Sequence, residues 1–494
     1  MSHASRTRPA SIPSPFPRTQ RSPPRWAISC GPTKMSPREI FALRDHLGAE
    51  LKGRTLSDAH DVVSLTDILS QTVLGGRLHE LSGRAVLLKL SDQLRSGLAM
   101  IELDGIARRM LLCPPDLNPA HLDVLIADAG IDAVVTDEPD RWAGSGIALI
   151  VTAQLPLQAT APAKTERATE WLMLTSGTSG VPKIAGHTLE ALTGVIVAEG
   201  PARGPVPVWA TFYDIRRYGG LQIFLRAILS GGSMVLSDPH EALGDHVTRL
   251  NARGVSHISG TPSHWRKLLM SGSATQFAPR YVRLSGEIAD QAVLDGLKVA
   301  FPNSSIGHAY ASTEAGVGFA VNDGLEGFPA DYLGNRSGVE MKVVDGSLRI
   351  RSTRTAHAYI GRNAAALADA DGFVDSGDIV ELRGDRYYFV GRRGGIINIG
   401  GLKVHPEEIE AVINRHADVR MSRAKSRRSP ITGGIVVADV ILADGTDPGR
   451  AKEIRDQILD QCRAQLASHK VPAVIRFVEA LDVTPAGKLA RTDA

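Results

Sequence analysis

The chain reads Leu174-Thr175-Ser176-Gly177-Thr178-Ser179-Gly180-Val181-Pro182-Lys183 from residue 174 to residue 183, directly after a short apolar run that begins at Trp171. Glycines let backbone N–H groups approach phosphate oxygens, the hydroxyls donate further hydrogen bonds, and Lys183 supplies a cation. The pattern is typical of a loop that holds a polyphosphate. Taken alone, its composition favours a flexible Ser/Gly surface loop.

The loop is not a Walker A motif. That motif needs Gly, four residues and then Gly-Lys-Ser/Thr before a helix, whereas Gly177 and Gly180 are too close and Ile184 follows the lysine. Pro182 also disfavours helical geometry at Val181, so the loop cannot run straight into a helix. The pattern therefore disfavours a P-loop NTPase.

The loop resembles the phosphate loop of the adenylate-forming (AMP-binding) superfamily, which includes acyl-CoA synthetases, luciferases and the adenylation domains of peptide synthetases. The family pattern is Thr/Ser-Ser-Gly-Thr-Thr/Ser-Gly-x-Pro-Lys-Gly, and this chain departs from it only at Ile184. The resemblance implies that the ATP phosphates are bound by Thr175, Ser176, Gly177, Thr178, Ser179, Gly180 and Lys183.

A second block, from Gly307 to Glu314, resembles the Tyr-Gly-Ser-Thr-Glu motif of the family. The resemblance implies that Tyr310 and Ala311 bind the nucleotide, with the ring suited to stacking on adenine, and that Thr313 bonds the α-phosphate. Glu314 would be a hard oxygen ligand for Mg²⁺. Gly286 and Glu287 are assigned to the nucleotide site as well. A lone Ser-Thr-Glu triplet is more often a helix cap.

Two further blocks follow in the family's order. The segment Gly372–Asp378, with Tyr387–Arg392 after it, implies that Asp378 accepts the ribose hydroxyls and that Arg392 supports the same sugar. The segment Gly391–Glu410 joins a Gly-Gly hinge to an apolar strand, to the pair Gly400-Gly401, and to a helix that begins at Pro406. By resemblance the hinge is Gly394, and Gly400 and Gly401 lie beside the pantetheine channel.

Near the carboxyl end, Thr484–Arg491 resembles the closing Pro-x-Gly-Lys loop of the family. Lys488 is then the catalytic lysine. Because only three residues follow Arg491, we expect the acceptor thiol to come from a separate molecule.

Length and composition predict a large α/β protein. A chain of 494 residues, 43% of them hydrophobic and 49 of them glycine, exceeds what one hydrophobic core usually serves. We expect layered α/β subdomains in a large N-terminal domain, residues 36–391, and a smaller, mobile α+β C-terminal domain, residues 392–494. The expected elements are a helix over Glu39–Leu51, a strand over Arg84–Leu90, a helix over Pro119–Ala129, and strands over Ala133–Val135 and Ile147–Val151.

Residues 1–35 are rich in Pro, Ser and Arg, with six basic and no acidic residues, and predict a disordered tail; Met35 is an alternative start of translation. The net charge of +3 arises in this tail, so a nucleic-acid-binding function has no support.

The chain has three cysteines, Cys30, Cys113 and Cys462. They are far apart and odd in number, which favours a reducing compartment. No apolar run approaches the roughly 18 residues of a membrane span. We expect a cytoplasmic enzyme.

The parts together predict activation of a carboxylic acid by ATP and Mg²⁺ to an acyl-adenylate, followed by transfer to a thiol, most simply CoA. Two alternatives stay open: an adenylating enzyme that loads the pantetheine of a separate acyl carrier protein, and a non-catalytic nucleotide-binding descendant. The substrate acid cannot be read from the sequence. Arg217 could pair with its carboxylate, whereas Asp214 sits about three residues too early to bind an amine. The basic cluster Arg420, Arg423, Lys425, Arg427 and Arg428 could bind CoA phosphates or an acidic carrier, or be a solvated face.

Overall fold

The computed structural model describes residues 42–47, 51–175, 181–196, 205–238, 240–399, 402–429, 433–484 and 487–490. The expected site residues outside these ranges are Ser176, Gly177, Thr178, Ser179, Gly180, Gly400 and Gly401. The expected tail over residues 1–35 lies outside them as well.

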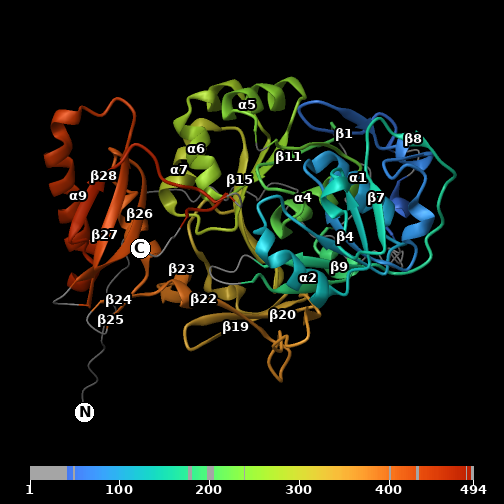
Figure 1. Ribbon diagram of the computed structural model, residues 1–494. Coiled ribbons are helices and arrows are strands. Elements are labelled where there is room, and N and C mark those ends of the chain that lie inside the picture. Colours follow the sequence, from blue (N-terminus) through green and yellow to red (C-terminus); the bar gives the residue numbers. More distant parts are fainter. Residues whose placement is uncertain are drawn as a thin grey trace, which may run out of the picture. The chain divides into compact units, whose positions relative to one another are not determined.

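Two large sheets form the first part of the described chain (Figure 1). The eight-stranded sheet has, in spatial order, β16 (Gly316–Val321), β15 (Ser305–Ser312), β14 (Tyr281–Ser285), β13 (His257–Gly260), β11 (Val208–Thr211), β12 (Ser233–Val235), β1 (Thr55–Ser57) and β2 (Val62–Ser64). The seven-stranded sheet has β21 (Ala358–Ile360), β10 (Ile184–His187), β9 (Glu170–Leu174), β5 (Arg109–Leu112), β4 (Ala85–Lys89), β6 (Ala133–Thr136) and β7 (Leu149–Thr152). The central strands of both sheets pair in parallel. A short pair, β3 (Gln71–Thr72) and β8 (Gln158–Ala159), stands apart from them.

Helices cover both faces of these sheets. The described α-helices of this part are α1 (Gln93–Leu103), α2 (Leu122–Ala129), α3 (Leu189–Thr193), α4 (Tyr218–Leu229), α5 (Leu243–Ala252), α6 (Pro262–Met270) and α7 (Gln291–Ala300). One core contains side chains of both sheets together with α1 and α4, which therefore lie between the sheets. Helices α5, α6 and α7 share a second core on the far face of the eight-stranded sheet, and α2 packs on the far face of the other sheet. The result is a layered α/β architecture.

The layer of α1 and α4 between the two sheets is tightly packed at two glycines. A side chain at Gly97 of α1 would meet Phe224 at 3.0 Å, and one at Gly220 of α4 would meet the backbone oxygen of Asp214 at 2.2 Å. These positions allow α1 and α4 to approach each other and the preceding loop closely.

A third, six-stranded sheet carries the ribose motif. Its strands are β17 (Phe328–Pro329), β23 (Arg386–Arg392), β22 (Val374–Arg383), β20 (Ser347–Ser352), β19 (Val339–Val344) and β18 (Gly334–Arg336). Asp345 and Gly346 both have positive φ, 50° and 75°, in the two-residue turn between β19 and β20. Strands β19 and β20 are thus joined by a two-residue hairpin turn, the shortest common kind.

The C-terminal segment forms its own smaller α+β core. It contains β24 (Ile397–Ile399), β25 (Leu402–Val404), α8 (Pro406–Ile413), β26 (Val419–Ser429), β27 (Gly433–Leu442), α9 (Ala451–Gln465) and β28 (Val474–Phe477). Apolar residues of α8 and α9 pack against the three-stranded sheet of β26, β27 and β28. The large α/β domain and the small α+β domain expected from the sequence are both present.

Most of the expected elements are confirmed, with one exception. The helix expected over Glu39–Leu51 is wrong, because the described part is only a 3-10 helix, Leu43–His46, after which Leu47 turns extended. Its position is set by tertiary contacts, since the Leu43 N–H donates to the buried Asp104 carboxylate at 2.8 Å. Among the described residues no helix is long and apolar enough to cross a membrane.

Candidate active site

The two ends of the phosphate loop are joined by the antiparallel pair β9 and β10. Leu174 pairs with Ile184, and the Thr175 N–H donates to the Lys183 carbonyl at 2.9 Å. Ile184, where the family has glycine, is a buried core residue of this pair. The strands therefore fix the base of the loop and place Lys183 at its exit.

Tyr359 connects Lys183 to Glu314. The Lys183 Nζ lies 4.8 Å from the Tyr359 ring centroid, and the Tyr359 hydroxyl donates to Glu314 Oε1 at 3.2 Å. Burial and the neighbouring Glu314 carboxylate raise the pKa of Tyr359, so its hydroxyl stays a donor at neutral pH. Thr313 and Glu314 occupy the turn between β15 and β16. The structure thus brings Lys183 and Glu314 together through a tyrosine that the sequence reasoning missed.

The expected ribose residues form one connected group. Asp378 and Arg392 pair across β22 and β23, with Arg392 Nε 2.9 Å from Asp378 Oδ1, and Arg392 Nη2 donates to the Ser376 carbonyl at 3.0 Å. The other carboxylate oxygen, Oδ2, accepts from the Tyr310 hydroxyl at 2.6 Å. Tyr310 and Asp378, 68 residues apart in the chain, therefore meet at one place.

The Tyr310 ring already has aromatic partners. It stacks on Phe319 with centroids 5.6 Å apart and on Phe389 at 5.1 Å, with interplanar angles of 18° and 8°. The strand pairing shifts between Tyr310 and Ala311, a bulge that redirects the side chains after it. The ring is thereby held to orient its hydroxyl on Asp378, while its stacking on adenine stays a prediction.

The loop that carries Lys488 is held against the large domain by three contacts. The Thr261 hydroxyl donates to the Gly487 carbonyl at 2.5 Å, and the Leu489 N–H donates to Glu287 Oε1 at 2.9 Å. Gly487 has φ 73°, and a Cβ there would lie 1.9 Å from the His264 ring. We call Thr261, His264 and Glu287 the latch. Of these three, sequence reasoning singled out only Glu287.

Glu287 bridges the Lys488 loop and the start of helix α6 with its two carboxylate oxygens. Its second oxygen accepts from the Ser263 N–H, near the start of α6, at 2.9 Å. The helix amino end stabilises a carboxylate at this place. Both oxygens are thus engaged by backbone donors, which gives Glu287 a positioning role toward the Lys488 loop.

Lys488 itself is surrounded by the other expected site residues. A Cβ at Gly286, which has φ 85°, would lie 3.8 Å from Lys488 Cε. Burial lowers the pKa of Lys488, and the charges of Arg392 and Arg217 act in the same direction while Glu287 and Asp378 oppose them. The C-terminal lysine therefore lies among the residues assigned to the nucleotide.

The structure gives partners to both side chains that were considered for substrate contacts. Arg217 Nη2 is bound to both oxygens of Asp116, at 2.5 and 2.6 Å, so this nitrogen is engaged without a substrate carboxylate. Asp214 is paired with Arg216 at 2.5 Å, and Arg216 is fully buried. Asp214 is therefore neutralised by its neighbour, in agreement with the spacing argument against an amine site.

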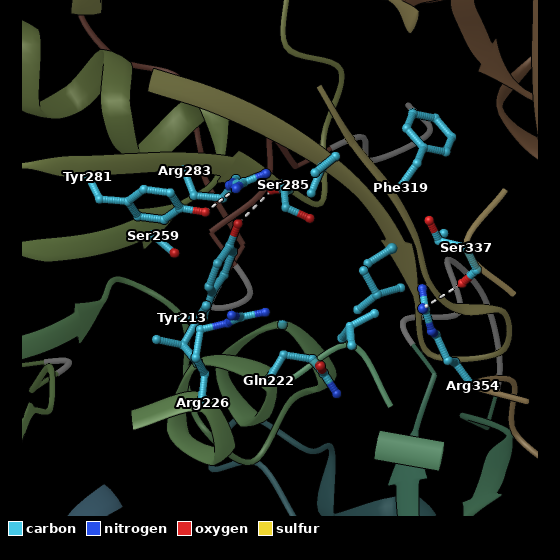
Figure 2. A pocket seen from close by; sticks show the side chains of 18 of the residues that line it. Tyr213, Gln222, Arg226, Ser259, Tyr281, Arg283, Ser285, Phe319, Ser337 and Arg354 are labelled. Atoms are coloured by element: carbon cyan, nitrogen blue, oxygen red, sulfur yellow. Dashed lines mark hydrogen bonds between the residues drawn. The ribbon is translucent and has the colours of Figure 1, made fainter. Parts of the chain in front are cut away.

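A cavity of about 340 Å³ opens beside this site (Figure 2). Its wall near Lys488 includes Ser285, the neighbour of Gly286, and Tyr213, whose hydroxyl donates to the Ser285 carbonyl at 2.7 Å. One face of α4 lines it with Gly219, Gln222, Ile223 and Arg226, and Ala311 lines it from β15. The spacing i, i+3, i+4, i+7 marks that helix face, a signal that was readable in the sequence.

Three side chains of the expected basic cluster, Arg420, Arg423 and Lys425, have carboxylate partners. The carboxylate of Asp439 on β27, only 3% exposed, binds Arg423 at 3.1 Å, Lys425 at 2.9 Å and Arg476 at 2.6 Å. Arg420 pairs with Asp444 at 2.8 Å. Because four cations share two carboxylates, the cluster keeps a positive charge, and its binding of CoA phosphates or a carrier protein stays a prediction.

Comparison with known families gives matches to both parts of the chain. The model described as AMP-binding enzyme matches residues 109–353, and the model described as AMP-binding enzyme C-terminal domain matches residues 408–488. The 2-succinylbenzoate–CoA ligase of Salmonella typhimurium is 27% identical over 389 residues, which cover 76% of this chain and 80% of the relative. That of Listeria innocua is 28% identical over 338 residues, covering 65% and 68%.

Solved structures share the fold. The anthranilate CoA ligase AuaEII in complex with anthranoyl-AMP superposes with a TM-score of 0.75 at 18% identity, covering 90% of this chain and 94% of that one. The amide bond synthetase McbA of Marinactinospora thermotolerans gives 0.71 at 19% identity, covering 90% and 98%. Similarity at this level establishes the architecture and leaves the acyl acceptor open.

Proposed function

This chain belongs to the AMP-binding enzyme family and is an enzyme of its acyl-CoA ligase (AMP-forming) type, and from that premise we propose how its residues divide the work. A carboxylate oxygen of the substrate attacks the α-phosphorus of ATP, and pyrophosphate leaves with its bonding electrons. A thiol, most simply that of CoA, then attacks the acyl carbon, loses its proton, and displaces AMP.

Lys488 acts in the first step. It bridges the incoming carboxylate and the α-phosphate, and its charge offsets the negative charge that gathers there. The latch supports this role because Thr261, His264 and Glu287 hold the loop with Lys488 beside Gly286. With no side chain at Gly286, the space next to the lysine stays open.

Asp378 and Arg392 hold the ribose, and Lys183 with Thr175 holds the leaving pyrophosphate. Positioning of this kind converts a bimolecular encounter into an aligned displacement. Mg²⁺, when bound, would neutralise phosphate charge, with Glu314 as its protein ligand. The Glu314 carboxylate, in the turn between β15 and β16, is a hard oxygen ligand of the kind that Mg²⁺ prefers.

The small domain, residues 392–494, rotates between the two steps relative to residues 36–391, since Lys488 blocks the approach of the thiol. Gly394 is the hinge, and Gly400 and Gly401 move to the pantetheine channel. The buried free thiols Cys113 and Cys462 support a reducing, cytoplasmic setting.

The observation that carries the proposal is the docked Lys488 loop, which joins the C-terminal lysine to the ribose pair Asp378 and Arg392. The test is ATP–pyrophosphate exchange across a panel of carboxylic acids, followed by thioester formation with CoA or with a phosphopantetheinyl carrier protein. Exchange with at least one acid and a thioester on CoA are expected. A thioester on the carrier alone would replace CoA as acceptor, and tight ATP binding without exchange for any acid would overturn the enzyme assignment.

A further inference from the structure

Tyr359 lies on β21, the strand at one edge of the seven-stranded sheet, next to the strand that follows the phosphate loop. Strand β21 pairs antiparallel with β10, and Tyr359 lies opposite Ala185. Residues opposite each other in an antiparallel pair point to the same face, and so do residues two apart on one strand. Because Lys183 precedes Ala185 by two residues, this register directs the side chains of Tyr359 and Lys183 to one face of the sheet edge.

The backbone just before Tyr359 is fixed to both segments that are assigned to the phosphates. The Ala356 N–H donates to the Glu314 carbonyl at 2.9 Å, and the His357 N–H donates to the Gly186 carbonyl of β10 at 2.9 Å. This stretch of chain therefore joins the turn that carries Glu314 to the strand that leaves the phosphate loop. It fixes the Tyr359 backbone independently of the tyrosine side chain.

The Tyr359 hydroxyl holds the carboxylate of Glu314. It donates to Glu314 Oε1 at 3.2 Å, and within the described part of the chain no second hydrogen bond reaches the Glu314 side chain. A carboxylate has about four acceptor sites on its two oxygens, so this bond leaves most of its capacity for another ligand. The direction in which Glu314 presents that capacity depends on the tyrosine.

The Tyr359 ring holds the ammonium of Lys183. The Lys183 Nζ lies 4.8 Å from the ring centroid, within the range of about 6 Å over which a cation is attracted to an aromatic face. Lys183 is exposed, and an unheld lysine side chain loses rotamer freedom when it binds a ligand. Contact with the ring reduces this freedom before the ligand arrives, which lowers the entropic cost of binding.

We propose that Tyr359 is a positioning residue of the site, which orients the Glu314 carboxylate through its hydroxyl and the Lys183 ammonium through its ring. The inference rests on the proposed function for the roles of these two charges toward the ATP phosphates. It goes beyond that function because a single side chain couples the two charges. Loss of the hydroxyl should therefore affect Glu314 alone, and loss of the ring should affect both.

The experiment measures ATP binding by isothermal titration calorimetry without any acid, once with Mg²⁺ and once with EDTA. The ratio of the two dissociation constants gives the Mg²⁺-dependent part of the affinity and requires no turnover. Tyr359→Phe removes the hydroxyl and keeps the ring. It should reduce this ratio by about tenfold, the scale of one hydrogen bond to a charged group, and leave the dissociation constant in EDTA unchanged.

Tyr359→Leu removes the ring as well as the hydroxyl. It should reduce the ratio as Tyr359→Phe does and also raise the dissociation constant in EDTA by about fivefold, the scale of one partly exposed cation–π contact. In ATP–pyrophosphate exchange, the KM for pyrophosphate should rise in Tyr359→Leu and not in Tyr359→Phe, because Lys183 is the residue proposed to hold pyrophosphate.

Tyr388 provides the matched controls. It lies on β23, and the Arg383 guanidinium carbon is 5.4 Å from its ring centroid, so it is a second tyrosine with a cation over its ring. Tyr388→Phe and Tyr388→Leu should keep the wild-type ratio and the wild-type dissociation constant in EDTA. Thermal melting checks that each variant is folded, and Tyr359→Phe alone still tests the hydroxyl if Tyr359→Leu does not fold.

Double variants separate positioning from general support of the fold. In a Glu314→Gln background, Tyr359→Phe should reduce the ratio no further, since the hydroxyl acts through that carboxylate. In a Lys183→Met background, Tyr359→Leu should raise the dissociation constant in EDTA no further. A tyrosine that only stabilises the fold would weaken binding in these backgrounds as much as in the wild type.

An unchanged ratio in Tyr359→Phe, a wild-type ratio near one, or additive losses in both double variants would overturn the positioning role. Those results leave the proposed function standing, because pyrophosphate exchange tests it separately. If exchange fails with every acid while the binding pattern holds, the proposed function falls and the positioning of the two charges remains. If the folded wild type does not bind ATP, both fall together.

Discussion

At the scale of single residues, Lys488 is the sharpest test of the site. Its burial, and the placement of Asp378 and Arg392 around it, support the proposed role in adenylate formation. Lys488→Ala should reduce pyrophosphate exchange by at least a hundredfold, the scale of about 3 kcal/mol for one electrostatic stabiliser. Chemically prepared acyl-AMP should still be converted to the thioester. Equal loss in both half-reactions would contradict the role.

The lowered pKa of Lys488 predicts a pH effect with a definite sign. The protonated lysine is the active form, and it is lost as pH rises through the lowered pKa of the docked state. Adenylation should therefore fall on the alkaline side below the ordinary lysine range near 10.4. The thioester step does not use Lys488 in the proposed mechanism, so its rate should not show this alkaline decrease. Rates of the two half-reactions measured separately over the same pH series check it.

Gly487 sets the position of its neighbour Lys488. Its φ of 73° favours glycine, and an added Cβ would collide with the His264 ring at 1.9 Å. Gly487→Ala should undock the loop and abolish exchange while the protein stays folded. Gly445→Ala is the control, because Gly445 has φ 78° with no atom within 4 Å of the added Cβ. If both variants behave alike, backbone strain rather than the collision is responsible.

At the scale of elements, the start of α6 is shared between folding and function. The Thr261 oxygen accepts the His264 N–H at 3.1 Å as the N-cap, and its proton goes to the Gly487 carbonyl. Thr261→Val should cost about 1 kcal/mol of stability from the lost cap. It should lower the exchange rate as well, whereas Thr261→Ser keeps both. Denaturant melts and exchange assays on the two variants separate the effects, and normal exchange in the valine variant would remove Thr261 from the latch.

Elements were predictable wherever the signal was local. The strand before the phosphate loop, the strand Ala85–Lys89 and the helix beginning at Pro406 follow from apolar runs and a Pro-Glu-Glu start. The helix expected over Glu39–Leu51 failed because contacts with Asp104, 61 residues away, decide that segment. The ion-pair partners of charged residues could not be predicted either, since Arg217 binds Asp116, which lies 101 residues away in the sequence. Spacing along one chain does not identify such partners.

At the scale of the whole molecule, the two domains can each be read from the sequence, but their contact cannot. The latch joins Thr261 to Gly487 across 226 residues and Glu287 to Leu489 across 202. Its contacts join the Thr261–Glu287 region to the Lys488 loop, and neither segment carries a sequence signal that predicts the contact. The docked state holds Lys488 in the site, and in the proposed mechanism these contacts open before the second half-reaction.

We expect the small domain to rotate about the backbone of Gly394 when the latch opens. It lies in a 3-10 turn, Arg393–Gly395, between β23 and β24, and nothing lies within 4 Å of a Cβ added there. Gly391, by contrast, has φ 146° and would place a Cβ 2.6 Å from Glu407, so it is packed too tightly to swing freely. The open surroundings of Gly394 leave its backbone free to change.

Gly394→Pro should separate the half-reactions. Proline fixes φ near −65°, a value that suits the 3-10 turn of the docked state and opposes a second geometry. Pyrophosphate exchange should therefore stay near the wild-type rate while thioester formation from acyl-AMP collapses. Gly394→Ala, which adds a side chain without fixing φ, should retain both. If the proline variant keeps both rates, or loses both while remaining folded, the rotation does not occur at Gly394, and Gly395, which also has open surroundings, becomes the next position to test.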